Sequence, residues 1–188
     1  MKQGSRFLLL AALGWAVTAS ADPTALQLVA KGNDYVGVQS KDRVVMIMSE
    51  KSAGTLTPAI WHIVYFDPDA PFKTVDVKFG GGEEMQVAHP VHPFQVPAKD
   101  LAVLDRSKIQ VDSDRALEIA TGQPLLRPFT LRAAKLTLEH NESGLVWKVQ
   151  LWAAKLRDPN KEADVGTVTL SATDGTVLKA DLHPGRAD

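Results

Sequence analysis

Two stretches of the chain alternate hydrophobic and polar residues with the period of a β-strand. They cover residues 60–66 and 146–152, and each contains a tryptophan near its start. Because alternate side chains of a strand point to opposite sides, each stretch predicts a strand with one buried face. The side chains that share the hydrophobic face are Trp61, Ile63 and Tyr65 in the first stretch, and Trp147, Val149 and Leu151 in the second.

A second alternating strand follows each of these stretches, and a glycine follows it at a fixed distance. Gly82 comes seven residues after Val75, and Gly175 comes seven residues after Val168. A short hydrophobic run after each glycine predicts the return strand of a hairpin, because glycine suits the positive φ angles of tight turns. The equal spacing indicates that the two halves of the chain are repeats.

Each half also begins with a short predicted helix. Residues 23–32 and 113–122 carry hydrophobic side chains at helical spacing, and both end in glycine. One more strand, at 43–48 and at 135–139, separates each helix from its tryptophan strand. The order of elements predicts an α+β fold of two repeated units, each a short helix packed on an antiparallel sheet of about four strands.

The boundary between the two units is marked by proline. We expect a first unit at residues 22–88, a Pro-rich linker at 89–104 and a second unit at 105–188. The second unit has a longer connection after its tryptophan strand, the polar segment 155–164, which predicts an exposed loop.

Residues 1–21 have the pattern of a secretory signal peptide. Lys2 and Arg6 precede a hydrophobic run of about eleven residues, and small residues mark a cleavage site after Ala21. Because the chain has no cysteine, disulfides and thiol chemistry are excluded, which fits a bacterial periplasm better than a eukaryotic secretory route. We therefore expect a periplasmic or secreted protein that has no membrane insertion after cleavage.

Composition sets further limits on function. Hydrophobic residues make up 45% and charged residues 23% of the chain, as in ordinary globular proteins. Loss of the two basic leader residues leaves 19 basic and 22 acidic side chains, a net charge of −3. Binding to nucleic acid requires a basic face, so we expect no nucleic-acid partner.

The second half resembles a PepSY-type domain over roughly residues 110–182. The matching segments are the ALEIA stretch at 116–120, the WKVQL strand at 147–151 and the hairpin GTVTLSATDGTVL at 166–178. The first half is similar to a degenerate copy, and a tandem of such units resembles small secreted proteins related to the β-lactamase inhibitor fold. The resemblance implies a non-catalytic exported module, in some relatives linked to holding or restraining a peptidase.

Three motifs invite chemical hypotheses that the sequence does not favour. His89 and His92 lie between prolines without a third metal ligand nearby. Asp67 and Asp69 lack the further oxygens of a calcium loop and are better interpreted as a turn. The triple glycine at 80–82 lacks the following helix of a phosphate loop and predicts a hairpin turn. We therefore predict no metal site and no cofactor.

Trp152 differs from the other two strand tryptophans, because it lies on the polar face of its strand with Lys148 and Gln150. An exposed aromatic side chain among polar ones is typical of a partner-binding surface. In the alternative interpretation, this face packs on the first unit or on the linker around Phe94. We name Trp152, Lys148 and Gln150 as candidate partner-binding residues.

The sequence thus favours a non-enzymatic exported module that binds a protein or peptide. Inhibition or restraint of an exported hydrolase is its most specific form. The alternative is a periplasmic protein that binds a small ligand or metal. No catalytic motif is found in the chain, so we predict that it is not an enzyme, and its oligomeric state is left open.

Overall fold

A computed structural model describes residues 22–88 and 102–188 of the chain. The predicted signal peptide lies outside these residues, as do His89, His92 and Phe94 of the predicted linker. Among the described residues, no helix is long and hydrophobic enough to cross a membrane.

The described residues form two α-helices and eight β-strands. The helices are α1 (Ala25–Gly32) and α2 (Ser113–Thr121). The strands are β1 (Val44–Ser49), β2 (Ile60–Phe66), β3 (Thr74–Gly80), β4 (Glu83–Ala88), β5 (Leu131–Asn141), β6 (Gly144–Ala154), β7 (Glu162–Ser171) and β8 (Val177–Leu182). Short 3-10 helices occur at Arg106–Lys108, Pro124–Leu126 and Pro184–Ala187.

All eight strands belong to one antiparallel sheet, in the order β4-β3-β2-β1-β5-β6-β7-β8. The predicted α+β class is therefore confirmed. The sheet is continuous across its middle, where the first strand after α1 pairs with the first strand after α2. This answers a question that the strand pattern left open, because alternation along a strand does not reveal which strand lies beside it.

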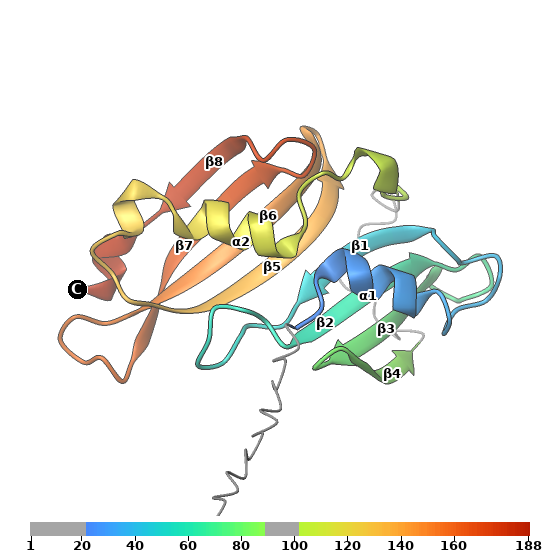
Figure 1. The fold of residues 1–188 in the computed structure, drawn as a ribbon, viewed down its shortest axis with the longest axis horizontal. Coiled ribbons are helices and arrows are strands. Elements are labelled where there is room, and N and C mark those ends of the chain that lie inside the picture. Colours follow the sequence, from blue (N-terminus) through green and yellow to red (C-terminus); the bar gives the residue numbers. More distant parts are fainter. Residues whose placement is uncertain (1–21, 89–101) are drawn as a thin grey trace, which may run out of the picture.

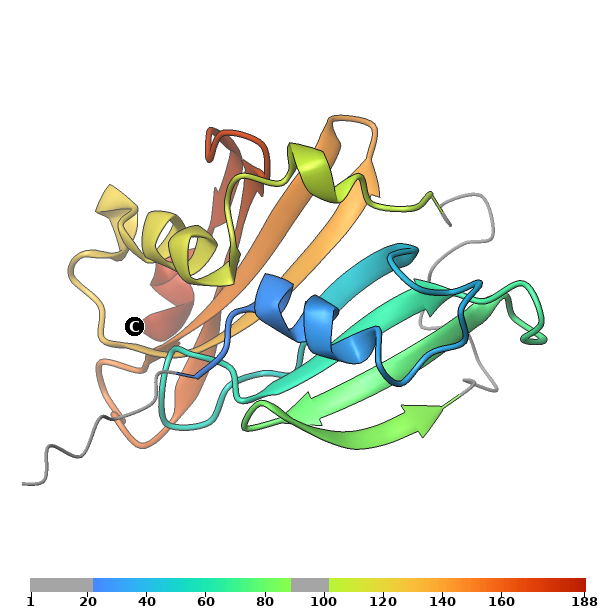
Figure 2. The ribbon, with the colours of Figure 1, turned by 45° about the vertical axis from the view of Figure 1, so that its right-hand side comes forward.

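Both helices cover the same face of the sheet, as Figure 1 and the turned view of Figure 2 show. Helix α1 lies over the half formed by β1 to β4, and α2 lies over the half formed by β5 to β8. The main hydrophobic core fills the space between the helices and the sheet and includes residues of both halves. No described helix covers the opposite side, which we call the helix-free face.

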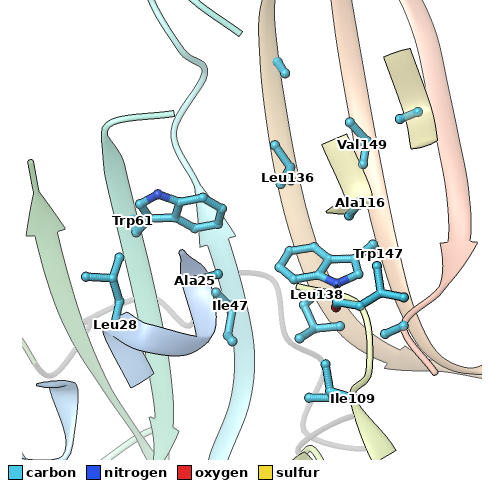
Figure 3. Packing of buried hydrophobic residues seen from close by; sticks show 14 of the residues in the cluster. Ala25, Leu28, Ile47, Trp61, Ile109, Ala116, Leu136, Leu138, Trp147 and Val149 are labelled. Atoms are coloured by element: carbon cyan, nitrogen blue, oxygen red, sulfur yellow. Dashed lines mark hydrogen bonds between the residues drawn. The ribbon is translucent and has the colours of Figure 1, made fainter. Parts of the chain in front are cut away.

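The two strand tryptophans occupy corresponding places in this core. Trp61 on β2 and Trp147 on β6 are 3% and 0% exposed and point to the helix side of the sheet (Figure 3). The Trp61 indole N–H donates to the backbone carbonyl of Pro58, in the connection before β2, at 3.1 Å. The Trp147 indole N–H donates to the backbone carbonyl of Val111, in the connection before α2, at 2.8 Å. A buried indole needs such a partner, because its polar N–H has left water.

The N-termini of the two helices are joined by hydrogen bonds. The Asp112 carboxylate accepts from Ser113 N at the start of α2 and from Leu26 N in α1, at 2.6 and 3.2 Å. The Ser113 hydroxyl oxygen accepts from Ala25 N at 3.0 Å. Free N–H groups at a helix start need acceptors, so residues of α2 help to cap α1 across 86 and 88 residues of sequence.

Two buried serines complete the contact between β1 and β5. The register pairs only Ile47 with Leu138 and Met48 with Thr137. Beyond these pairs, Leu136 N–H donates to Ser49 Oγ at 2.9 Å, and Ala134 N–H donates to Ser52 Oγ at 2.8 Å. Ser52 N–H also donates to the Ala134 carbonyl at 2.9 Å. The serine hydroxyls thus replace the backbone carbonyls that a longer strand pair would supply.

The predicted elements are all present, with differences at their ends. Strands β5, β6 and β7 are 11, 11 and 10 residues long, well beyond the predicted cores at 135–139, 146–152 and 167–172. Helix α2 has Asp112 as its N-cap, one residue before the predicted start. Gly81, Gly82 and Gly175 have positive φ angles in the expected hairpin turns. The three strands are longer than predicted because cross-strand pairing with their neighbours continues beyond the residues that alternate in the sequence.

The serine contacts predict a large stability effect from a small change. Ser49→Ala leaves the Leu136 N–H buried without an acceptor, and we expect a loss of about 1 to 3 kcal/mol in the free energy of unfolding. Urea unfolding followed by tryptophan fluorescence measures this loss. The matched control is Ser143→Ala in the exposed β5–β6 turn, which should change the free energy by no more than about 0.5 kcal/mol. Equal effects of the two changes would contradict the role given to Ser49.

Candidate functional site

A single row of side chains crosses the helix-free face from β3 to β8. Each strand contributes one residue to the row, and the register places that residue directly opposite the row residues of the neighbouring strands. On the side of the sheet that faces the helices, the adjacent positions of β2, β3, β5, β6 and β7 are buried hydrophobic residues. The row consists of Lys78, His62, Met48, Thr137, Lys148, Thr169 and Lys179, and we call it the central row.

In the half formed by β5 to β8, the helix-free face is polar and partly exposed. Lys135, Gln150 and Thr167 form a second row beside the central row. All three are partly exposed, while Leu136, the residue that follows Lys135 on β5, is 0% exposed. An antiparallel sheet with one buried and one solvated face has this alternation.

The three predicted partner-binding residues all lie on this face, and each contacts another side chain. Lys148 Nζ lies 2.5 Å from Glu139 Oε1, and Gln150 Nε2 donates to Asp164 Oδ2 at 2.7 Å. Trp152 is partly exposed. The structure therefore brings the three together on one surface and gives them defined positions there.

Trp152 also contacts the first half of the chain. The ammonium of Lys51 lies 4.6 Å from the centre of the indole ring, and the same ammonium lies 2.6 Å from Glu162 Oε2. A cation above an aromatic face is attracted by the ring, with about 0.5 to 1 kcal/mol at exposed sites. The indole therefore lies where the two halves meet on the helix-free face.

A group of four charged side chains lies at the other end of the central row. His62 Nδ1 lies 2.8 Å from Asp76 Oδ2, and His62 Nε2 lies 3.3 Å from Glu50 Oε1. Lys78 Nζ is 2.7 Å from the same Glu50 oxygen. We call Glu50, His62, Asp76 and Lys78 the charged cluster.

Burial makes the charged cluster unusual for a sheet face. Asp76 is 5% exposed, and its Oδ1 atom has no hydrogen-bond partner among the described residues. The side chain of His62 is 12% exposed. A buried carboxylate needs a cationic or hydrogen-bonding neighbour, because it has lost most of its hydration. The contact with the imidazole supplies this partner on one carboxylate oxygen.

The carboxylates control the charge of His62. The hydrogen bond with Asp76 raises the pKa of the imidazole, against the opposite effect of burial, and the bond with Glu50 adds to the increase. The hydrogen bond from Lys78 lowers the pKa of Glu50. The cluster therefore favours charged forms of both His62 and Glu50 near neutral pH.

This geometry is better suited to electrostatic recognition than to proton transfer. Each ring nitrogen of His62 faces a carboxylate, whereas a general base directs one nitrogen to the group that it deprotonates. The two carboxylates contact opposite ring nitrogens, so they do not converge on one point with the imidazole. Among the described residues, no group of three His, Asp or Glu side chains could hold a metal ion.

The other sequence candidates lie in turns. Asp69 N–H donates to Asp67 Oδ1 at 3.0 Å in the β2–β3 connection, as the turn interpretation predicts. Residues 81 and 82 of the triple glycine lie between β3 and β4.

Sequence reasoning missed the charged cluster, although its residues were visible in the pattern. His62 lies at a polar position between Trp61 and Ile63, and Asp76 lies at a polar position of the next strand. A polar residue that alternates with buried ones is normally interpreted as solvated. The sequence signal was the short turn between the strands, which fixes their register and brings the two residues to neighbouring positions on one face.

The charged cluster predicts a specific pH dependence. The His62 pKa should lie above its ordinary value of 6.5, and NMR titration of the imidazole signals measures it. Because the folded pKa is raised, the stabilisation is complete below the unfolded value and is lost as the pH rises through the folded value. Asp76→Asn should lower the His62 pKa, because the negative partner is removed while burial persists.

The same prediction can be checked by unfolding. His62→Gln should lose stability relative to the unchanged protein mainly at acidic pH, with a smaller difference at alkaline pH. His140→Gln is the control, because His140 is exposed near the β5–β6 turn and should leave stability unchanged. A folded His62 pKa at or below 6.5 would contradict the role of the carboxylates.

Comparison with known proteins gives no family for this chain. No family model matches it, and no curated protein or solved structure matches it. We therefore base the proposed function on the contacts, exposure and charge of the residues described above.

Proposed function

We propose that this chain is a non-enzymatic exported module that binds a protein or peptide on its helix-free face. The observation that carries the proposal is the central row, in which polar and charged side chains of six strands lie in one line that is interrupted only by Met48 on β1. The opposite side of the sheet is buried under two helices, so the partly exposed helix-free face of β5 to β8 is the broad sheet surface available to a partner. On β1 and β2 this face includes the buried side chains of Met46 and Val64.

The character of this face fits a polar, hydrated protein interface. On β5 to β7 the side chains of its two rows are threonines, lysines and a glutamine, with the partly exposed indole of Trp152 at the margin. Interfaces between proteins that also exist separately are polar at the rim and use aromatic residues as anchors. Lys51, which is itself paired with Glu162, contacts one side of the Trp152 indole, so little side-chain entropy is lost when a partner contacts it.

We also propose that the fold consists of two PepSY-like units. The order helix, then four strands, occurs twice, and the first strand of each half lies at the centre of the sheet. The tryptophan of each half donates to an upstream carbonyl. The turns after the two tryptophan strands share a local hydrogen bond, from Asp69 N–H to Asp67 and from Asn160 N–H to Asp158.

The contacts of residues 50–52 support a single binding surface rather than two. Glu50 contacts His62 in the first half, Lys51 contacts Trp152 in the second half, and Ser52 bonds to β5. Three consecutive residues therefore connect the charged cluster, the indole and the middle of the sheet. A partner on the central row would contact both units at once, which gives tandem units more area than either has alone.

Within this function, restraint of an exported hydrolase is the form that we propose to test first. Such an inhibitor needs a rigid surface and no catalytic groups of its own. The sequence motifs include no catalytic set, and the His62 geometry favours a charge role.

Site-specific crosslinking tests the proposed binding face. A photoreactive residue at Thr169, the β7 position of the central row, should give a discrete crosslinked adduct in the exported compartment. The control position is Arg115 on α2, which is exposed on the helix side and should give none. Trp152→Ala should reduce the yield at Thr169 several-fold, because it removes the aromatic anchor.

The identity of the adduct tests the inhibitory form. If the partner is a hydrolase, the purified chain should lower its activity in a saturable manner, and Trp152→Ala should weaken this effect. Circular dichroism of the variant checks that the fold is retained. Equal adducts from Thr169 and Arg115, or none from either, would count against the binding face.

A further inference from the structure

Strand β4 forms one edge of the sheet (Figures 1 and 2). It pairs with β3 on one side, and no strand of the described residues pairs with its outer side. A strand that is paired on one side only directs a row of backbone N–H and C=O groups outward, where another extended chain can bind them. The opposite edge of the sheet is β8, so the two edges can be compared within one molecule.

A row of hydrophobic side chains crosses the whole sheet on the side that faces the helices. The registers place one residue of each strand in this row, which we call the helix-side row. From β4 to β8 it consists of Val87, Val77, Ile63, Ile47, Leu138, Trp147, Leu170 and Val177. The members between the two edge strands are at most 1% exposed, so the row forms an uninterrupted hydrophobic layer.

The two ends of the helix-side row differ in exposure. Val177 on β8 packs against the main hydrophobic core. Val87 on β4 is 41% exposed and is not among the residues of that core. Met85, also on β4, is 58% exposed. Since directly opposite side chains of paired strands contact each other, a hydrophobic residue on a strand beside β4 would cover Val87 and continue the row.

The two edges also differ in the residues that discourage further pairing. Proteins protect sheet edges with lysine, other charged side chains and proline. On β8, Lys179 Nζ lies 3.6 Å from Asp181 Oδ2, and His183 Nε2 lies 3.3 Å from Asp181 Oδ1. β4 contains neither lysine nor proline, and its two carboxylates lie together at its start. Of the two edges, β4 is therefore the one better suited to accept another strand.

The charge of β4 indicates what kind of chain it accepts. Glu83 and Glu84 begin the strand, and the recorded ion pair of these carboxylates is that of Glu83 Oε1 with Lys31 Nζ at 4.0 Å. The same ammonium donates to the Gly82 carbonyl at 2.8 Å. Opposite charges on neighbouring strands stabilise pairing and like charges destabilise it. A basic segment is thus favoured, whereas a second copy of β4 would bring further carboxylates to the edge.

We propose that the outer edge of β4 binds an extended, basic peptide segment of a partner protein, which adds a further strand to the sheet. The segment has hydrophobic residues at alternate positions that contact Val87 and Met85, and a basic residue beside Glu83 or Glu84. In this mode, backbone hydrogen bonds provide affinity and alternate side chains provide specificity. The edge is separate from the helix-free face of β5 to β8, so it is a binding surface beyond the one proposed above.

Peptide titration followed by two-dimensional amide NMR tests the edge. The probe is the acetylated and amidated peptide Thr-Val-Thr-Val-Lys-Lys, whose order suits antiparallel pairing with β4. We expect saturable shifts at residues 83–88, slower hydrogen exchange of β4 amides, and no shift at residues 177–182 of β8. The same peptide with N-methyl groups on alternate residues should not bind, because it lacks the N–H donors. Thr-Val-Thr-Val-Glu-Glu should bind several-fold more weakly, because its charge is reversed.

Two variants place a lysine on one edge each. Val87→Lys should weaken peptide binding about tenfold, because it replaces a hydrophobic contact with a charge that repels the basic peptide. Leu178→Lys on β8 is the matched control, since Leu178 is 46% exposed and lies on the other edge, and it should leave binding unchanged. Circular dichroism checks that both variants retain the fold.

Shifts that do not saturate, or equal binding of the N-methylated peptide, would overturn the site. An equal effect of Val87→Lys and Leu178→Lys would do the same, because it would indicate general charge repulsion. Concentration-dependent shifts at residues 83–88 without peptide would assign the edge to a second copy of the chain instead. None of these results bears on the helix-free face, because crosslinking at Thr169 reports on a different surface.

Discussion

The contact between β1 and β5 is the constraint on which the rest of this structure depends. This contact joins the two half-sheets into one sheet, and its serine hydrogen bonds link residues that are 82 and 87 positions apart in the sequence. The regular register covers only two residue pairs, so the buried hydroxyls of Ser49 and Ser52 provide the remaining acceptors. Unpaired N–H groups at this place would be buried, and their cost explains why small polar residues occupy an otherwise hydrophobic region.

Continuity of the sheet also decides where function is possible. Once the two halves share one sheet, both helices lie on the same side, and their N-termini come close enough for Asp112 and Ser113 to bond to α1. Most of the hydrophobic surface of both halves is then used on that side, and a smaller buried cluster of Val45, Met46 and Val64 remains apart from it. What remains is one polar band across six strands, with Trp152 and Lys51 where the halves meet and the charged cluster toward β3. The proposed partner surface is a consequence of this asymmetry between the two faces.

Much of the fold could be predicted from the sequence because its local signals agree. Alternation around Trp61 and Trp147 indicated buried strand faces, and the structure places both indoles in the core. The glycines at 82 and 175 marked hairpin turns and have the positive φ angles that such turns require. The candidate site was only partly foreseen. Trp152, Lys148 and Gln150 were expected on one face, but their contacts with Lys51, Glu139 and Asp164 were not, because these partners lie on other strands or in another half.

By itself, the sequence determined the elements of this protein, their order and the face that each strand buries, because these depend on periodicity and on turn residues close in the chain. The tertiary structure alone decided that the two halves form one sheet, that Asp112 caps both helices, and that the helix-side row ends exposed at Val87. It also decided that His62 is held between two carboxylates. The physical reason is that pairing between distant strands and the loss of hydration on burial depend on which surfaces meet in space. The spacing of residues along one strand does not determine which surfaces meet.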